Sequence, residues 1–208
     1  MNIDVPPFVP IISASIGAVS ALLGVALSFG RDWFVQKLKD GQQRVFVALR
    51  LAAELEDFAV RCAQAASDHG EPQVQPHGQE EYVPRYSAPV LTIDYTGYEW
   101  RLIPKDLLMR ILELPHMVQR AHLILADVNE YMTNPPHFED YYSERSLRFG
   151  LLGIRALEVA RDLRVRHGAS ASIPAIDFED EYDIENHLQQ IVFDVKKSRR
   201  AAEYSVLN

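Results

Sequence analysis

Residues 11–29 read IISASIGAVSALLGVALSF, and no charged side chain occurs anywhere between residues 5 and 30. In a helix that rises 1.5 Å per residue, roughly 20 apolar residues span the hydrocarbon core of a bilayer, about 30 Å. A helix also satisfies its own backbone hydrogen bonds, which hydrocarbon requires. The sequence therefore predicts a transmembrane helix over residues 8–30, preceded by an external tail of residues 1–7.

The charges that flank this segment predict its orientation. Asp4 precedes it, whereas Arg31, Lys37, Lys39 and Arg44 follow it closely. The positive-inside rule then places the N-terminus outside and residues 31–208 in the cytosol, as a single-pass protein of the cell's inner membrane. A cleaved signal peptide is the alternative, because residues 26–28 resemble a cleavage site, but the first ten residues lack the basic start of a signal peptide.

The rest of the chain has the pattern of a mainly α-helical protein. We expect a helical stem over residues 31–67, continuous with the membrane helix, then a mobile loop over 68–89, then a helical cytosolic domain over 90–208. Within that domain, residues 90–100 alternate as in a short strand or hairpin. Helices follow over 105–132, 138–167 and 178–204, and the first of them either kinks or restarts at Pro115. Gly150 and Gly153 are expected where helices pack closely.

Apolar or small residues recur at alternating intervals of four and three positions, without a break in this spacing, from the membrane segment into the stem. Among the fifteen positions of this pattern only Arg31 is neither apolar nor small. Small residues let helices pack closely in a membrane, and apolar a and d positions form the seam of a coiled coil. The predicted homo-oligomer seam is Ser13, Gly17, Ser20, Gly24, Ala48, Ala52 and Ala59. The alternative is a single amphipathic helix folded onto its own domain.

Arg31, Phe34 and Leu38 lie on this seam at the inner end of the membrane segment. In an oligomer, a ring of Arg31 side chains would select ions, and rings of Phe34 and Leu38 would form a dewetted gate. These three residues are therefore the candidate pore or gate. The alternative is an ordinary membrane anchor, in which Arg31 reaches the lipid headgroups.

The sequence offers no catalytic chemistry. It contains no GxxxxGK, GxSxG, HExxH or CxxC motif, and its seven histidines do not form a pair spaced for metal binding on one helix. We therefore expect no enzyme activity, no metal and no cofactor. Cys62, the one cysteine, is expected to be a buried apolar residue. The net charge of −8 argues against sequence-independent binding of duplex DNA.

Arginines concentrate in the helix predicted over 138–167. Arg145, Arg148 and Arg155 share a helix face and are the candidates for binding an anionic ligand, since arginine suits phosphate. The alternative is salt bridges to the acidic residues nearby. The last helix has acidic residues in its first turns and Lys196, Lys197, Arg199 and Arg200 near its end, a distribution that complements the helix dipole. The alternative is that the acidic residues form a metal site or the basic residues a functional tail.

In topology the chain resembles the small single-span membrane effectors of bacterial antiphage defence systems, such as the Hailong-type effector. The resemblance covers the span, the helical cytosolic part and the lack of catalytic motifs, and matches no residue motif. It implies an ion channel gated by a cytosolic ligand, an anionic nucleotide or oligonucleotide. The rival function is a membrane-tethered, non-catalytic subunit that docks a cytosolic protein partner.

Overall fold

The computed structural model describes the backbone of residues 9–74, 80–132, 138–168 and 183–206, and from residue 36 onward most of the side chains of these segments. The contacts divide the chain into two units, Met1–Arg44 and Val45–Asn208. The described elements are four α-helices, one 3-10 helix and a two-stranded sheet. The prediction of a mainly helical protein is confirmed.

Helix α1 (Val9–Ala66) begins in the first unit and ends in the second. In the second unit its buried residues recur every three or four positions, which is the spacing of one helix face. They include Val47, Leu51, Leu55, Phe58 and Cys62, each at most 5% exposed. This part of α1 is therefore a core helix of its own domain.

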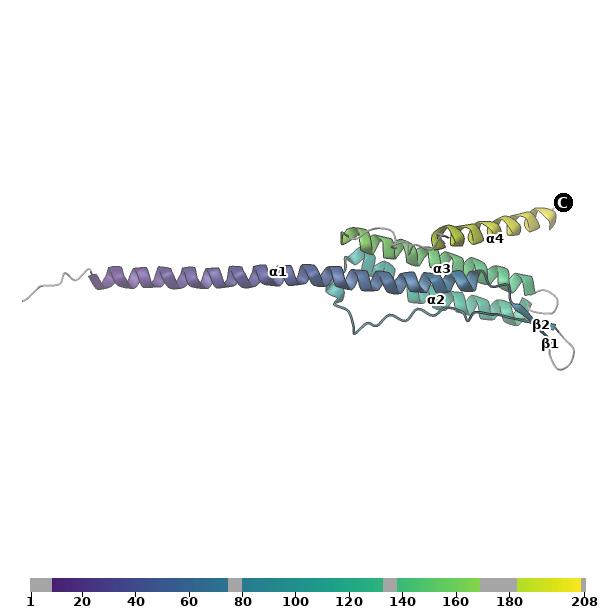
Figure 1. Ribbon diagram of the computed structural model, residues 1–208, viewed down its shortest axis with the longest axis horizontal. Helices are drawn as coiled ribbons and strands as arrows, with labels where there is room; N and C mark the ends of the chain where they lie inside the picture. Colours follow the sequence, from purple (N-terminus) through teal and green to yellow (C-terminus); the bar gives the residue numbers. More distant parts are fainter. Residues whose placement is uncertain (1–8, 75–79, 133–137, 169–182, 207–208) are drawn as a thin grey trace, which may run out of the picture. The chain divides into compact units, whose positions relative to one another are not determined.

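Helices α2 (Lys105–Met132) and α3 (Phe138–Arg166) complete the core, and α4 (Ile184–Val206) packs along α3 (Figure 1). Their buried residues join those of α1 in one cluster; among them are Leu107, Ile111, Leu114, Phe149, Leu152, Val159, Leu163 and Leu188. Pro115 lies inside α2 and does not end it. A proline removes one helical hydrogen bond, but here Ile111, Leu114 and Val118 are buried around it and hold the helix together.

The helix ends follow their sequence signals. Gly168 has a φ of +74°, the left-handed conformation that terminates helices, and its N–H donates to Val165 O (3.2 Å) just after α3. Asp183 precedes α4, and its Oδ1 accepts a hydrogen bond from Asn186 N–H (3.0 Å). The acidic residues 179–181, which were expected in the first turns of the last helix, lie outside the described residues.

The strands lie elsewhere than predicted. β1 (Glu71–Val74) and β2 (Glu80–Val83) pair antiparallel within the segment expected to be a loop. The prediction of a strand or hairpin over residues 90–100 is wrong, because this segment is irregular and leads into the 3-10 helix η1 (Trp100–Leu102). Its alternation reflects packing instead, because Leu91 and Ile93 are buried while Thr92 and Asp94 are exposed.

The close packing expected at two glycines is confirmed. A Cβ at Gly150 would lie 2.7 Å from Val192 Cγ2, and one at Gly153 would lie 2.8 Å from Leu188 Cδ1 and 3.1 Å from Cys62 Cβ. These contacts are shorter than van der Waals distances, so only glycine lets α4 approach α3 this closely. The packing fixes α4 on the surface of the core.

Among the described side chains, no helix contains an apolar stretch long enough to cross a membrane. Residues 11–29 have no described side chains, so the predicted span lies outside this finding.

Candidate functional site

The strongest polar feature inside the domain is a junction between the end of α1 and α3. We define the polar junction as Asp68, Arg145 and Ser146, with the backbone of Ala66 and Tyr86. Asp68 and Arg145 form a salt bridge of 2.8 Å, and their side chains are 3% and 1% exposed. Arg145 also donates to Tyr86 O, and Ser146 Oγ donates to Ala66 O (2.6 Å). The junction therefore ties α3 to the last residues of α1 and to the segment after the hairpin.

The Asp68 carboxylate is held in its charged form. Burial by itself would raise its pKa, but N–H groups of Tyr86 (3.0 Å) and Gly70 (2.9 Å) and the guanidinium of Arg145 donate to it, and the pKa of Asp68 is lowered overall. A buried ion pair with this many donors is a structural feature and not an open binding site.

This placement decides the role of Arg145. Its side chain was a candidate for an anionic ligand, but it is buried and its charge is compensated within the chain. Its Nε atom is buried without a hydrogen-bond partner among the described residues, while both of its terminal nitrogens are used. Arg145 therefore acts in folding, not in recognition at the surface.

Arg148 and Arg155 also have acidic partners. Arg148 Nε lies 2.5 Å from Glu144 Oε1, and Arg155 Nη1 lies 3.0 Å from Glu158 Oε2. Glu144 accepts in addition from Arg199 of α4 (2.6 Å), and these bonds outweigh burial and lower its pKa. Both arginines are more than a third exposed. The structure therefore places the three predicted arginines in salt bridges. Arg148 and Arg155 pair with acidic residues nearby, as the alternative interpretation expected, whereas Arg145 pairs with the distant, buried Asp68.

The remaining arginines of α3 connect it to every other helix. Arg164 makes a bidentate contact with Glu56 of α1, with distances of 2.6 and 2.7 Å. Arg166 pairs with Asp106 of α2 (2.6 Å), and Arg161 pairs with Glu185 of α4. Bidentate arginine contacts add geometric specificity to a pair. The arginine-rich sequence of α3 thus serves to assemble the domain.

The structure describes the side chains of only one part of the predicted oligomer seam. Ala48, Ala52 and Ala59 are each 0% exposed within a single chain, where they belong to the hydrophobic core. Because these three alanines are packed within their own domain, we no longer propose them as part of an interface between chains. Ser13, Gly17, Ser20 and Gly24, and the candidate gate residues Arg31, Phe34 and Leu38, lie in α1 where no side chains are described.

Cys62 is buried, as expected, and burial raises the pKa of its thiol. Since the thiolate is the reactive form, this cysteine is inert in the folded protein. The described residues contain no group of three histidine, cysteine, aspartate or glutamate side chains arranged to hold a metal ion.

The structure also shows an exposed basic surface that the arginine pattern of α3 did not reveal. Lys196, Lys197 and Arg200 are exposed on α4, and no salt bridge to them occurs among the described residues. Phe193 (61% exposed) and Tyr204 (70%) lie beside them. The signal was present in the sequence as the basic cluster near the end of the last helix, for which we preferred the helix-dipole interpretation to that of a functional basic tail.

Comparison of the chain with protein-family models, with curated proteins and with solved structures found no match.

Proposed function

We propose that the protein is a homo-oligomeric, single-pass membrane effector with its N-terminus outside and its helical domain in the cytosol. The uncharged residues 11–29 and the basic residues that follow them support the span and its orientation. Small residues at positions 13, 17, 20 and 24 support association of the membrane helices. The resemblance to Hailong-type effectors supports a role in bacterial antiphage defence.

The observation that best supports coupling between the domain and the membrane is that α1 belongs to both units. Its residues from 47 to 66 are built into the core of the cytosolic domain, and its earlier residues include the predicted span. A change in how the domain packs around α1 would act on the same helix that enters the membrane. An element shared by two sites connects them physically, and coupling follows if that element has two arrangements that both sites bias.

In the finer form of the proposal the oligomer is a channel. Arg31 sets the ion preference, and Phe34 and Leu38 form a gate by dewetting. A cytosolic anionic ligand, a nucleotide or oligonucleotide, shifts the gate. The ligand does not bind at Arg145, whose charge is buried and paired.

Conductance of purified protein in liposomes tests the channel. Phe34→Ser should produce a leak in the absence of any stimulus, and Arg31→Glu should shift the ion preference toward cations. Arg61→Glu is the control, since Arg61 is exposed in the cytosolic domain beside Asp57. Currents that neither substitution at 31 or 34 alters would show that these residues do not line a conduction path.

A second function is favoured by the exposed face of α4: a membrane-tethered, non-catalytic subunit that docks a cytosolic protein. In that case the liposomes carry no current, and binding through α4 is the activity.

A further inference from the structure

Among the described residues, several cations of helix α4 form no salt bridge. Within the described part of Val45–Asn208, every arginine except Arg120 and Arg200 forms a salt bridge with a carboxylate. Within the described part of this unit, the cations without a salt bridge are Lys105, Arg120, Lys196, Lys197 and Arg200. Three of these five lie within five consecutive residues of α4, in a chain whose net charge is −8.

These cations share one helix face with two aromatic side chains. Phe193, Lys197, Arg200 and Tyr204 are spaced i, i+4, i+7 and i+11, which places them in line along α4 over about 17 Å. Lys196 lies beside this line. We call these five residues the α4 outer face; all five are exposed. Leu188 and Val192 lie on the side of α4 that is buried against α3.

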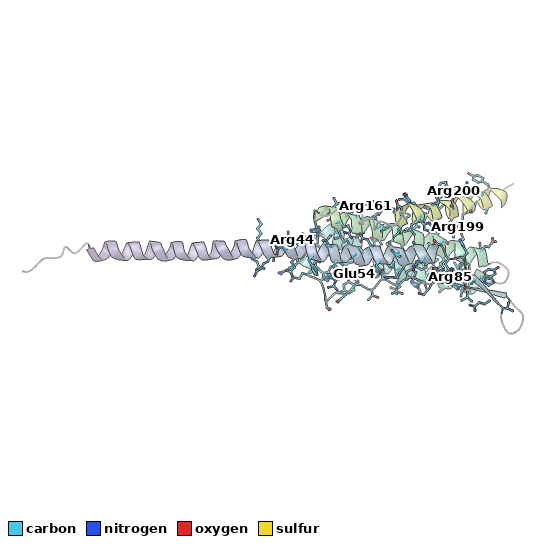
Figure 2. The ribbon with its side chains drawn as sticks, viewed as in Figure 1. Arg44, Glu54, Arg85, Arg161, Arg199 and Arg200 are labelled. Carbon is cyan, nitrogen blue, oxygen red and sulfur yellow. The ribbon has the colours of Figure 1, made fainter. Side chains whose placement is uncertain are left out.

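The α4 outer face is presented on a fixed helix. Arg199 is the immediate neighbour of Arg200, yet it turns toward α3 and pairs with Glu144 (2.6 Å), whereas Arg200 points away (Figure 2). Arg161 pairs with Glu185 in the first turn of α4. A ligand of this face would therefore bind a helix that is already ordered, which reduces the entropic cost of binding.

We propose that the α4 outer face binds an acidic peptide segment of a partner protein. Its carboxylates would pair with Lys196, Lys197 and Arg200, and its apolar side chains would contact Phe193 and Tyr204. Tyrosine and arginine are among the residue types enriched at the positions that supply most of the binding energy in protein interfaces.

The charge of the whole chain favours a protein over a polyanion. A nucleic acid or an anionic membrane presents negative charge over an area much wider than three cations, so the acidic remainder of the chain would oppose it. A short peptide segment, in contrast, presents carboxylates only next to these cations and does not extend over the acidic surface. The occupant we infer is therefore an acidic peptide and not an extended anionic surface.

This inference rests on the second proposed function, docking of a protein partner, and deepens it by naming the chemistry of that partner; it requires neither a pore nor an oligomer. The test of this inference measures peptide binding and not conductance, so the inference and the proposed channel can fail separately.

The test uses the full chain in a neutral detergent and a fluorescent synthetic peptide in which glutamate alternates with phenylalanine. Fluorescence anisotropy should show binding that weakens with added salt. Lys197→Glu combined with Arg200→Glu should weaken it about tenfold or more, since each reversal removes an attraction and adds a repulsion. Lys105→Glu combined with Arg120→Glu changes the net charge equally on exposed residues of α2 and should change it less than about twofold.

Aromatic substitutions test whether Phe193 and Tyr204 contribute to peptide binding. Phe193→Ala combined with Tyr204→Ala should weaken peptide binding several-fold, whereas Leu123→Ala, at a side chain 65% exposed on α2, should not. Because all of these side chains are exposed, circular dichroism should show unchanged helix content and thermal unfolding.

Three results would overturn the proposal. Equal weakening by the α4 and α2 charge reversals would mean that only net charge is sensed. Tighter binding of oligothymidylate or of phosphatidylserine vesicles, lost in the same α4 variant, would identify a polyanion as the occupant. Self-association through α4, detected as a change in mass when the charges are reversed, would identify a second copy of the chain.

Discussion

Arg145 of α3 and Asp68, two residues beyond the end of α1, form a salt bridge of 2.8 Å whose side chains are 1% and 3% exposed. Asp68 to Tyr86 is the stretch that carries the hairpin, and both ends of it contact Arg145. The pair therefore closes the segment that contains the hairpin and fixes it to α3.

Removal of one partner should be costly. Asp68→Ala leaves the guanidinium of Arg145 buried without its carboxylate, and the free energy of unfolding should fall by about 3–5 kcal/mol. Chemical denaturation measures this. The matched control is Glu158→Ala, which removes a half-exposed partner of Arg155 and should cost about 1 kcal/mol or less. Equal losses for the two variants would show that burial of the Arg145 pair contributes nothing.

Stability should depend on pH through two carboxylates. The folded-state pKa values of Asp68 and Glu144 are both lowered, because hydrogen bonds and arginine partners outweigh burial. The unfolded chain then binds more protons, so this stabilisation is complete above the unfolded pKa values, about 4, and is lost as the pH falls through the folded values. Denaturation at several acidic pH values should show a smaller loss for Asp68→Asn than for the natural chain. An identical loss would exclude Asp68 as a source of the effect.

The packing of α4 on α3 can be tested with a single methyl group. Gly153→Ala should lower the free energy of unfolding by about 1–3 kcal/mol, because its Cβ would overlap Leu188 and press on Cys62. Gly41→Ala is the control: its Cβ meets no atom within 4 Å in α1, where alanine favours a helix by about 1 kcal/mol. A Gly153→Ala variant as stable as the natural chain would mean that the two helices can separate without cost.

Topology has a direct chemical test. A cysteine at residue 2 should react with an impermeant thiol reagent on intact cells, and a cysteine at residue 75 should not. Cys62 gives no background, because it is buried. The opposite pattern of labelling would place the helical domain outside the cytosol and reverse the orientation that the flanking charges predict.

Much of the fold could be predicted because apolar periodicity and turn residues are local signals. The ends of α3 and the passage of a helix through 105–132 followed from spacing and from Gly168. The position of the strands could not be predicted in this way. Leu91 and Ile93 alternate with polar residues as a strand would, but their burial comes from packing against the helices, and alternation alone does not supply a hydrogen-bonded partner strand.

The candidate sites were harder to predict because they depend on partners distant in sequence. Arg145 and Asp68 are 77 residues apart, so no spacing rule connects them. Ala48, Ala52 and Ala59 fit a coiled-coil seam and a domain core equally well, since both require a small apolar helix face. Only the three-dimensional arrangement separates Arg199, which is paired, from Arg200 next to it.

The oligomeric state of the full chain tests the proposed effector most directly. Native mass spectrometry of protein extracted in a mild detergent should give a single species larger than the monomer. Gly17→Leu combined with Gly24→Leu should shift it toward the monomer by forcing the membrane helices apart. A natural chain that is monomeric under these conditions would contradict the account, because a single membrane helix encloses no pore.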